Sequence, residues 1–239
     1  EMAAILSYCS HVESADGDSP CVKMHTENLA VARKYFTLLR KTFNIRAEVS
    51  VRKSREVRFY SVIVSKDPEA RRLLGETCLL DEDGNVSECM SPMHHRLLRQ
   101  NCCRRAFIRG AFLAVGSVSD PEKSYHFEIV CSTQEKAEEL QSLLTAYEID
   151  AKIVMRKKHY VVYVKEGSQI VELLGLTGAH VSLMQLENVR IVKEMRNSVN
   201  RKVNCETANL NKTVSAAVRQ VEDIRYIQRT IGFQELNEG

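Results

Sequence analysis

The chain carries one structural pattern twice, and this internal duplication constrains its fold more than any other feature of the sequence. Residues Arg105–Asp120 (RAFIRGAFLAVGSVSD) and Glu1–His11 (EMAAILSYCSH) each read as a short apolar helix that runs into a strand. The segments after each copy keep the same order, at offsets that drift only from 106 to 100 residues. A repeated order of elements at a nearly constant offset indicates two copies of one structural unit.

Each copy is predicted to contain a helix, a β-hairpin, a second helix, a second hairpin and a third helix. The second helix is Glu27–Asn44 in the first copy, where apolar residues recur at helical spacing, and Gln134–Glu148 in the second. In the second hairpin we align the strand Arg58–Val64 with His159–Lys165. The pattern predicts an α+β fold in which two pseudo-symmetric αββαββα repeats form one saddle-shaped antiparallel sheet.

The domain boundaries follow from where this pattern starts and stops. We place the first repeat at residues 1–75, an acidic inter-repeat linker at 76–93, the second repeat at 94–178 and a helical extension at 179–239. The linker holds acidic residues around an Asp83-Gly84 turn, so we expect it to be solvated. The second repeat is predicted to begin on one helix from His95 to Val115.

The extension takes no part in the duplication. Apolar residues at helical spacing predict one helix over Leu183–Lys202 and another over Val214–Ile231. The segment between them, Asn204–Thr213, is rich in turn and cap formers, and we expect it to be a linker. Glu1 opens inside a helix without a capping residue, so we expect the sequence to be part of a longer chain.

Small residues predict that the two apolar helices cross in close contact. Gly110 and Ala114 lie four residues apart and share one helix face, and Ala3 and Ala4 are their expected partners on the first helix. An ordinary buried helix that happens to contain a glycine would show the same residues. Both interpretations remain open at this point.

The composition is that of a protein with a substantial core and no membrane anchor. The chain is 44% apolar, yet it contains no run long enough to span a membrane and no signal peptide. Its eight cysteines form no CxxC pair, which is typical of reduced thiols in a cytoplasmic protein. Cys89, His94, His95, Cys102 and Cys103 match no zinc-site spacing, so we expect no metal.

Two longer stretches carry a family resemblance. The sequences CCRRAFIRGAFLAVGSVSDPEKSYHFEI and MRNSVNRKVNCETANLNKTVSAAVRQVEDI resemble the WhiA family of bacterial regulators, and the paired helices with their hairpins resemble the LAGLIDADG fold of homing endonucleases. The resemblance covers essentially the whole chain. It implies a two-repeat LAGLIDADG domain joined to a helix-turn-helix domain beyond residue 239, acting in sporulation, cell division and chromosome segregation. It also implies a cytoplasmic, nucleoid-associated protein.

The resemblance identifies the positions at which a nuclease of this fold carries its catalytic acids. An acidic residue stands at the foot of each motif helix in the nucleases and holds divalent metal ions there. In this sequence those positions are Cys9 and Val115. Because Mg²⁺ prefers oxygen ligands and valine offers none, we expect a domain without nuclease activity and without a cofactor.

Basic residues of the predicted sheet are candidate contacts for double-stranded DNA. From strand alternation we expect the concave face to carry Arg52, Arg58, Tyr60, Lys152, Arg156, His159, Tyr163 and Lys165, with Lys53, Arg55, Lys157 and Lys158 at the hairpin tips. Such residues suit phosphate contacts along a duplex. Charges also alternate on any solvated strand face, and this alternative remains open.

Two functions are therefore compatible with the sequence. One is a DNA-binding transcriptional regulator of sporulation or cell division, in which a catalytically inactive domain assists a separate reader domain. The other is a protein-interaction module that docks RNA polymerase, a sigma factor or another regulator. In both, we expect a monomeric pseudo-dimer that does not bind membranes. Salt separates the two functions, because binding driven by phosphate contacts weakens steeply with ionic strength.

Overall fold

The structure of the chain is a computed structural model. It describes all residues except 16–18, 55, 81–84, 87–95 and 231–239. The described residues divide into two compact units, Glu1–Leu186 and a second unit that begins at Glu187. Among them, no helix combines the length and the apolar character needed to cross a membrane.

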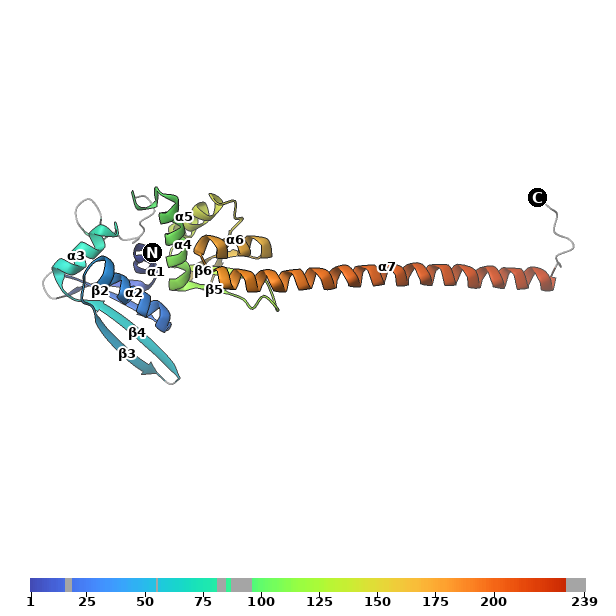
Figure 1. Cartoon of the computed structure of the whole chain (residues 1–239), viewed down its shortest axis with the longest axis horizontal. Helices are drawn as coiled ribbons and strands as arrows, with labels where there is room; N and C mark the ends of the chain where they lie inside the picture. Colours follow the sequence, from blue (N-terminus) through green and yellow to red (C-terminus); the bar gives the residue numbers. More distant parts are fainter. Residues whose placement is uncertain (16–18, 55, 81–84, 87–95, 231–239) are drawn as a thin grey trace. The chain divides into compact units, whose positions relative to one another are not determined.

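The first unit contains both repeats, and their elements follow the same order (Figure 1). The first repeat comprises α1 (Met2–Cys9), β1 (Ser10–Ala15), β2 (Ser19–Thr26), α2 (Leu29–Thr42), β3 (Glu48–Ser54), β4 (Val57–Val64) and α3 (Asp67–Glu76). The second comprises η1 (Arg96–Leu98), α4 (Asn101–Val115), β5 (Gly116–Val118), β6 (Phe127–Cys131), α5 (Gln134–Thr145), β7 (Lys152–Arg156), β8 (His159–Val164) and α6 (Gly167–Thr177). The predicted α+β fold of two αββαββα repeats is confirmed.

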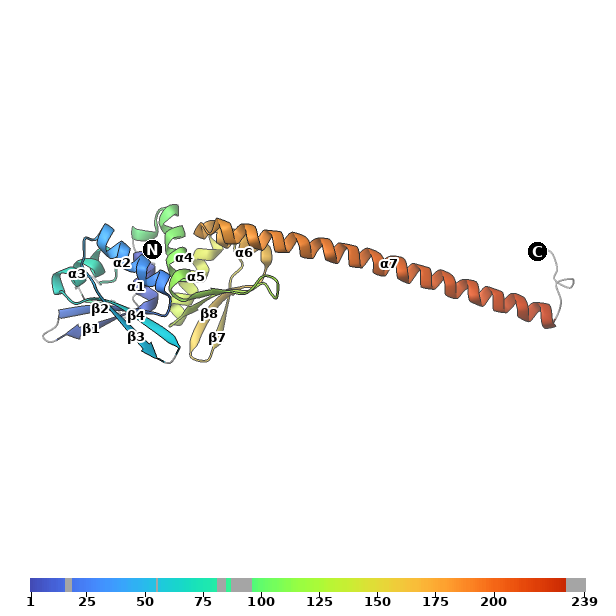
Figure 2. The same ribbon diagram turned by 60° about the horizontal axis from the view of Figure 1, so that its bottom comes forward.

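The strands form two antiparallel four-stranded sheets rather than the single predicted one. Their orders are β1-β2-β4-β3 and β5-β6-β8-β7, so the two copies share one topology. Figure 2 shows the strands on one side of the unit and the helices on the other. Each sheet therefore has a helix-covered face, which carries the core, and a helix-free face.

Strand pairing aligns β4 with β8 at an offset of 100 residues. Val62 pairs with Met24 and Val162 with Ile129, and both valines are buried beneath the helices. The alignment of Arg58–Val64 with His159–Lys165, at an offset of 101, is therefore wrong by one residue. A slip of one residue exchanges the two faces of a strand, because side chains alternate with a period of two. Arg58 thus corresponds to Lys158.

Other conformational details repeat between the two copies. The buried hydroxyls of Thr77 and Thr177 donate to the carbonyls of Leu73 and Leu173, at 2.7 and 3.0 Å. After Thr77 the chain reaches the fully buried Leu79, so the predicted solvated linker begins inside the core. Residues 81–84 and 87–93 of that linker lie outside the described part of the chain.

Helix α1 contributes to both cores and crosses α4. Ile5 and Leu6 lie in the core of the first repeat, whereas Ala4 belongs to that of the second. A Cβ atom added to Gly110 would lie 2.6 Å from the Glu1 carbonyl oxygen and 2.8 Å from the Ala4 Cβ. The absence of a side chain at Gly110 therefore permits the close approach of the two helices.

Helix α4 begins later than predicted, at Asn101. Arg96–Leu98 form a separate short 3-10 turn, and Arg104 Nε donates to the Leu98 carbonyl oxygen at 2.8 Å, which holds that turn against the helix. Arg105 donates through Nε and Nη2 to the carbonyls of Leu176 and Gly175, at 3.0 and 3.1 Å. These arginines therefore satisfy carbonyl groups within the fold.

Helix α7 is continuous from His180 to Thr230, so the predicted break at Asn204–Thr213 is wrong. The sequence from His180 to Thr230 contains neither glycine nor proline, the residues that most strongly end helices. Its cap-forming residues are accommodated within the helix: Thr213 Oγ1 donates to the Asn209 carbonyl oxygen at 3.0 Å. The residues beyond Thr230 lie outside the described part of the chain.

Candidate nucleic-acid interface

The feet of the two motif helices carry no carboxylate. Helix α1 ends at Cys9 and α4 at Val115, and each helix is followed directly by a strand, which begins at Ser10 or Gly116. Cys9 Sγ donates to the Ile5 carbonyl oxygen at 3.1 Å, and burial raises the pKa of this thiol to about 12. A neutral thiol and an isopropyl group lack the oxygen ligands that hard cations require.

Among the residues that the structure describes, no group of three or more His, Cys, Asp and Glu side chains is placed to hold a metal ion. Cys102 and Cys103 approach each other to 4.0 Å between sulfur atoms on α4. The other three candidate zinc ligands, Cys89, His94 and His95, lie outside the described residues.

The helix-free face of the second sheet gathers cationic and aromatic side chains. The pairs Lys152–Tyr163 and Arg156–His159 stand directly opposite across β7 and β8, so all four side chains share this face. The Lys165 ammonium lies 5.2 Å from the centroid of the Tyr163 ring, which places it beside them. The structure thus brings together the five residues that the sequence analysis assigned to this face.

An acidic residue that the sequence analysis missed lies among these cations. Glu128 stands opposite Tyr163 on β6 and accepts hydrogen bonds from His126 Nε2 and Ser117 Oγ at 3.0 and 3.1 Å. Its carboxylate is also 3.6 Å from Arg156 Nη1. The hydrogen bond from His126 is the main cause that lowers the pKa of Glu128, so the carboxylate stays charged and offsets part of the basic surface.

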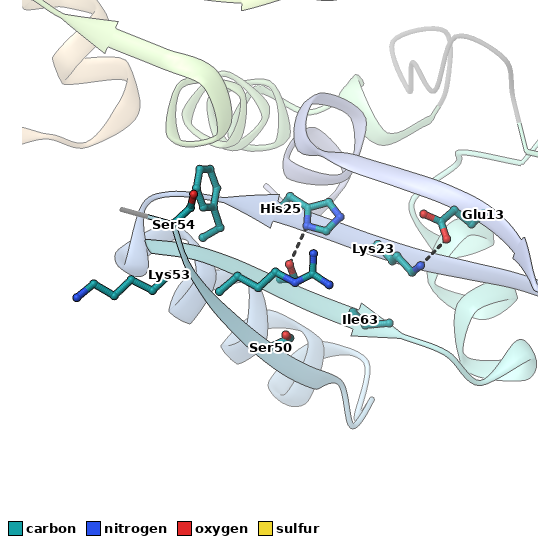
Figure 3. Close-up of a pocket in the computed structure, with 10 residues that line it drawn as sticks. Glu13, Lys23, His25, Ser50, Lys53, Ser54 and Ile63 are labelled. Carbon is teal, nitrogen blue, oxygen red and sulfur yellow. Dashed lines mark hydrogen bonds and ion pairs between the residues drawn. The ribbon is translucent and has the colours of Figure 1, made fainter. Parts of the chain in front are cut away.

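The corresponding face of the first sheet is closer to neutral. It has a hollow of about 670 Å³. The Glu13 carboxylate there is paired with the Lys23 ammonium, and His25 is hydrogen-bonded to Ser61 (Figure 3). Arg52 also lines the hollow. The two repeats therefore present faces of different charge, although they share one topology.

Arg58 and Tyr60 do not lie on this face, so their predicted placement is wrong. Arg52 stands opposite Phe59, whereas Arg58 stands opposite Lys53 and Tyr60 opposite Val51. Residues that stand directly opposite in an antiparallel pair point to the same side. Arg58 and Tyr60 therefore belong to the helix-covered side of the sheet.

The hairpin tips are described only in part. Lys53 reaches the rim of the first hollow, and its ammonium points away from the other lining side chains in Figure 3. Lys157 and Lys158 are exposed in the turn between β7 and β8. Arg55 lies outside the described residues. Of the small residues predicted at the helix crossing, Ala3 and Ala4 are buried and Ala114 is half-buried.

The duplicated topology and the two crossing helices define the class of protein. The chain has the two-repeat LAGLIDADG fold, which is found in homing endonucleases. The crystal structure of I-DmoI in complex with DNA and Mn is similar, with a TM-score of 0.52 and 13% identity over 74% of this chain and 94% of that one. Full-length DUF199/WhiA from Thermatoga maritima is also similar, with a TM-score of 0.64 and 20% identity over 99% and 77%.

Within that class, the chain belongs to the WhiA family. The models for the WhiA N-terminal LAGLIDADG-like domain, the WhiA LAGLIDADG-like domain and the WhiA C-terminal HTH domain match residues 1–80, 104–196 and 199–239. The chain is 53% identical to the probable cell division protein WhiA of Lachnoclostridium phytofermentans, over 100% of this chain and 77% of the relative. It is 47% identical to the Clostridium botulinum (strain Hall) protein of the same name, over 90% and 69%.

Proposed function

We propose that this chain is a DNA-binding regulator of transcription whose LAGLIDADG-like unit contacts the duplex without cutting it. The observation that carries the proposal is the basic face of the second repeat, where Lys152, Arg156 and Lys165 surround Tyr163 and His159. Cations spaced along one sheet face suit contacts to successive phosphates, which hold a protein on DNA without reading its sequence.

The residues at the feet of the two motif helices explain why the unit would bind DNA without cleaving it. Cleavage in this fold requires metal ions held by carboxylates at the feet of the motif helices. Cys9 and Val115 occupy those positions and supply no such ligand. The unit would therefore keep the DNA-facing architecture of the fold without its metal-dependent chemistry.

Sequence reading is assigned in this proposal to the helix-turn-helix domain, which the sequence analysis placed beyond residue 239 and whose family model already matches residues 199–239. The match of residues 199–239 to the model for the WhiA C-terminal HTH domain supports this assignment. The names of the relatives, which call them probable cell division proteins, support a role in cell division, and we extend the proposal to sporulation and chromosome segregation. We also propose a cytoplasmic location at the nucleoid.

The test is a salt titration of binding to specific and random duplexes by fluorescence anisotropy. The variant Lys152→Ala/Arg156→Ala/Lys165→Ala should bind both duplexes more weakly, and each lost phosphate contact should lower the salt slope by about one unit. The matched control, Lys66→Ala/Arg71→Ala/Arg72→Ala on α3 and its cap, removes the same charge from the helix-covered side. Equal affinity and slope for both variants would refute a DNA contact by this face.

The rival hypothesis, docking on RNA polymerase or a sigma factor, makes the opposite prediction. It expects the triple substitution to leave DNA binding unchanged and to abolish a protein complex instead. Binding through a largely apolar surface should also respond weakly to salt. The same titration therefore separates the two functions.

A further inference from the structure

An apolar groove lies between α2 and the β3–β4 hairpin, on the helix-covered side of the first sheet. Its volume is about 330 Å³, and its lining residues are Leu29, Ala32, Arg33, Phe36 and Thr37 of α2 and Val49, Val51, Tyr60 and Val62 of the hairpin. Val62 is fully buried, whereas Val49 and Val51 are 55% and 57% exposed. The groove thus has a buried floor and an apolar wall that the first repeat leaves in contact with solvent.

The edge of the groove is basic. Arg33 lines the groove from α2, and Arg58 stands one step along the same face from the Val51–Tyr60 pair. Lys53 stands opposite Arg58 at the hairpin tip, where its side chain also borders the hollow on the helix-free face. None of the ion pairs formed between described residues involves these three cations. Within the part of the chain that the structure describes, their charge is therefore available to acidic groups of a ligand.

The duplicated position in the second repeat is built differently. The N-caps Asn28 and Thr133 align α2 with α5, so Gln141 takes the place of Phe36 and Glu138 that of Arg33. Gln141 Nε2 donates to the Ala151 carbonyl oxygen at 2.7 Å, which ties the helix to the residue before β7. The apolar groove with a basic edge is thus a feature of the first repeat rather than of the fold.

We propose that this groove binds an acidic amphipathic segment of a partner protein. Leucine or phenylalanine side chains of the partner would fill the space beside Val51 and Phe36, and its carboxylates would pair with Arg33, Lys53 and Arg58. A volume near 330 Å³ lies at the lower end of the range of about 300–1,000 Å³ for ligand pockets, which suits a few side chains of one helix. Because the edge of the groove is positive, a partner segment with negative charge is favoured.

The site goes beyond the proposed DNA contact, because it uses the opposite side of the sheet. Duplex DNA offers phosphates to the cations but no apolar side chains to the valines and aromatic rings. A peptide with both kinds of group matches the whole surface.

The first experiment uses the full chain and a fluorescein-labelled peptide of about 16 residues, with leucines at positions i, i+3, i+4 and i+7 and acidic residues between them. Anisotropy should show saturable binding, and a scrambled peptide of equal composition should bind at least about tenfold more weakly. Val51→Asp and Lys53→Glu/Arg58→Glu should each reduce affinity at least about tenfold. Val51 is exposed, so its substitution should leave the core intact.

Matched controls come from the same sheet and from the other repeat. Arg52→Glu changes a charge on the helix-free side, and Met155→Asp changes the residue that corresponds to Val51. Both should bind the ordered peptide as the wild type does. Equal binding of ordered and scrambled peptides, or unchanged binding by Val51→Asp, would overturn the proposal. Displacement of the peptide by phosphatidylglycerol vesicles, or self-association that Val51→Asp abolishes in sedimentation, would assign the groove to a membrane or to a second copy and equally overturn it.

The DNA titration on the same variants separates this proposal from the function proposed above. Val51→Asp should bind duplex DNA like the wild type, whereas the substitutions at Lys152, Arg156 and Lys165 should leave peptide binding unchanged. Loss of DNA binding without loss of peptide binding in Val51→Asp would show that the groove is not the partner site. Loss of peptide binding in the variant substituted at Lys152, Arg156 and Lys165 would overturn the assignment of the two ligands to separate surfaces.

Discussion

Lys136 Nζ, at the start of α5, donates a 2.7 Å hydrogen bond to the main-chain carbonyl oxygen of Ser7 in α1. The bond joins the two repeats, because α1 belongs to the first and α5 to the second. Ser7 lies in the last turn of its helix, where carbonyl groups lack helical partners and a cation is favoured. The lysine side chain is buried and also lies 5.7 Å from the centroid of the Tyr8 ring.

We predict that Lys136→Met destabilises the protein by about 1–3 kcal/mol, since it leaves a buried carbonyl without its donor. Denaturant unfolding at constant pH measures this free energy. Lys152→Met, a substitution of an exposed lysine in β7, is the control and should change stability by less than about 0.5 kcal/mol. Equal stability of the two variants would show that the bond between the repeats contributes nothing.

Gly110→Ala should destabilise the protein by about 1–3 kcal/mol, because the added Cβ would lie 2.6 Å from the main-chain oxygen of Glu1, the N-cap of α1, which accepts a hydrogen bond from Ile5. Thermal melting provides the measurement. Gly75→Ala is a suitable control, since its Cβ would meet only the Leu80 Cδ1 at an ordinary 3.8 Å. A melting temperature unaffected by Gly110→Ala would mean that the helices stand apart.

The protein should not cut DNA in the presence of Mg²⁺ or Mn²⁺. The reason is the chemistry of Cys9 and Val115, which offer a neutral thiol and an alkyl group where metal ligands would be required. Conversion of supercoiled plasmid to the nicked form gives a sensitive assay. Metal-dependent nicking that disappears in the Cys9→Ala variant would contradict this expectation directly.

Glu128→Gln should strengthen DNA binding if the second sheet contacts phosphates. The substitution removes the Glu128 carboxylate that pairs with Arg156 on this face and keeps the shape of the side chain. We expect a higher affinity for specific and random duplexes alike and a steeper dependence on salt. Anisotropy titrations at two ionic strengths measure both quantities. Weaker binding by the variant would remove Arg156 from the interface.

The same carboxylate should make stability depend on pH. The pKa of Glu128 is lowered in the folded state, chiefly by the hydrogen bond from His126, so its stabilising contribution is present above the ordinary value of 4.5. The contribution is lost as the pH falls through the lower, folded-state pKa. Glu128→Gln should therefore be less stable than the wild type at about pH 7, with a difference that shrinks at about pH 3. A constant difference would show that the ionised carboxylate is not responsible.

Much of the fold could be predicted from the sequence, because the duplication repeats the order of elements and the apolar periodicity marks each one. The face assignment of β4 failed for a physical reason. Arg58 and His159 look alike as polar residues near the start of the second strand of each hairpin. The pairing instead aligns Tyr60 with Tyr160, which stand opposite Val51 and Met155. Packing of side chains beneath the helices fixes this register, and it leaves only a weak signal in a single sequence.

Other features were out of reach for different reasons. The continuous α7 contains cap-forming residues such as Asn209 and Thr213, whose local preferences favour a break but do not require one. Glu128, by contrast, could have been found: it alternates with the buried Phe127 and Ile129, which places it on the helix-free face. Its carboxylate reduces the positive charge of the helix-free face of the second sheet.

The position of α1, with Ile5 and Leu6 in one core and Ala4 in the other, means that neither half is a self-sufficient folding unit. The second repeat alone would expose the face of α4 around Gly110 that packs against α1. The first repeat alone would leave the corresponding face of α1 exposed. The two halves should therefore unfold in a single transition. Because the two repeats are joined in one chain, their sequences can diverge while their cores stay packed together. The second repeat can therefore carry a basic face and the first an apolar groove.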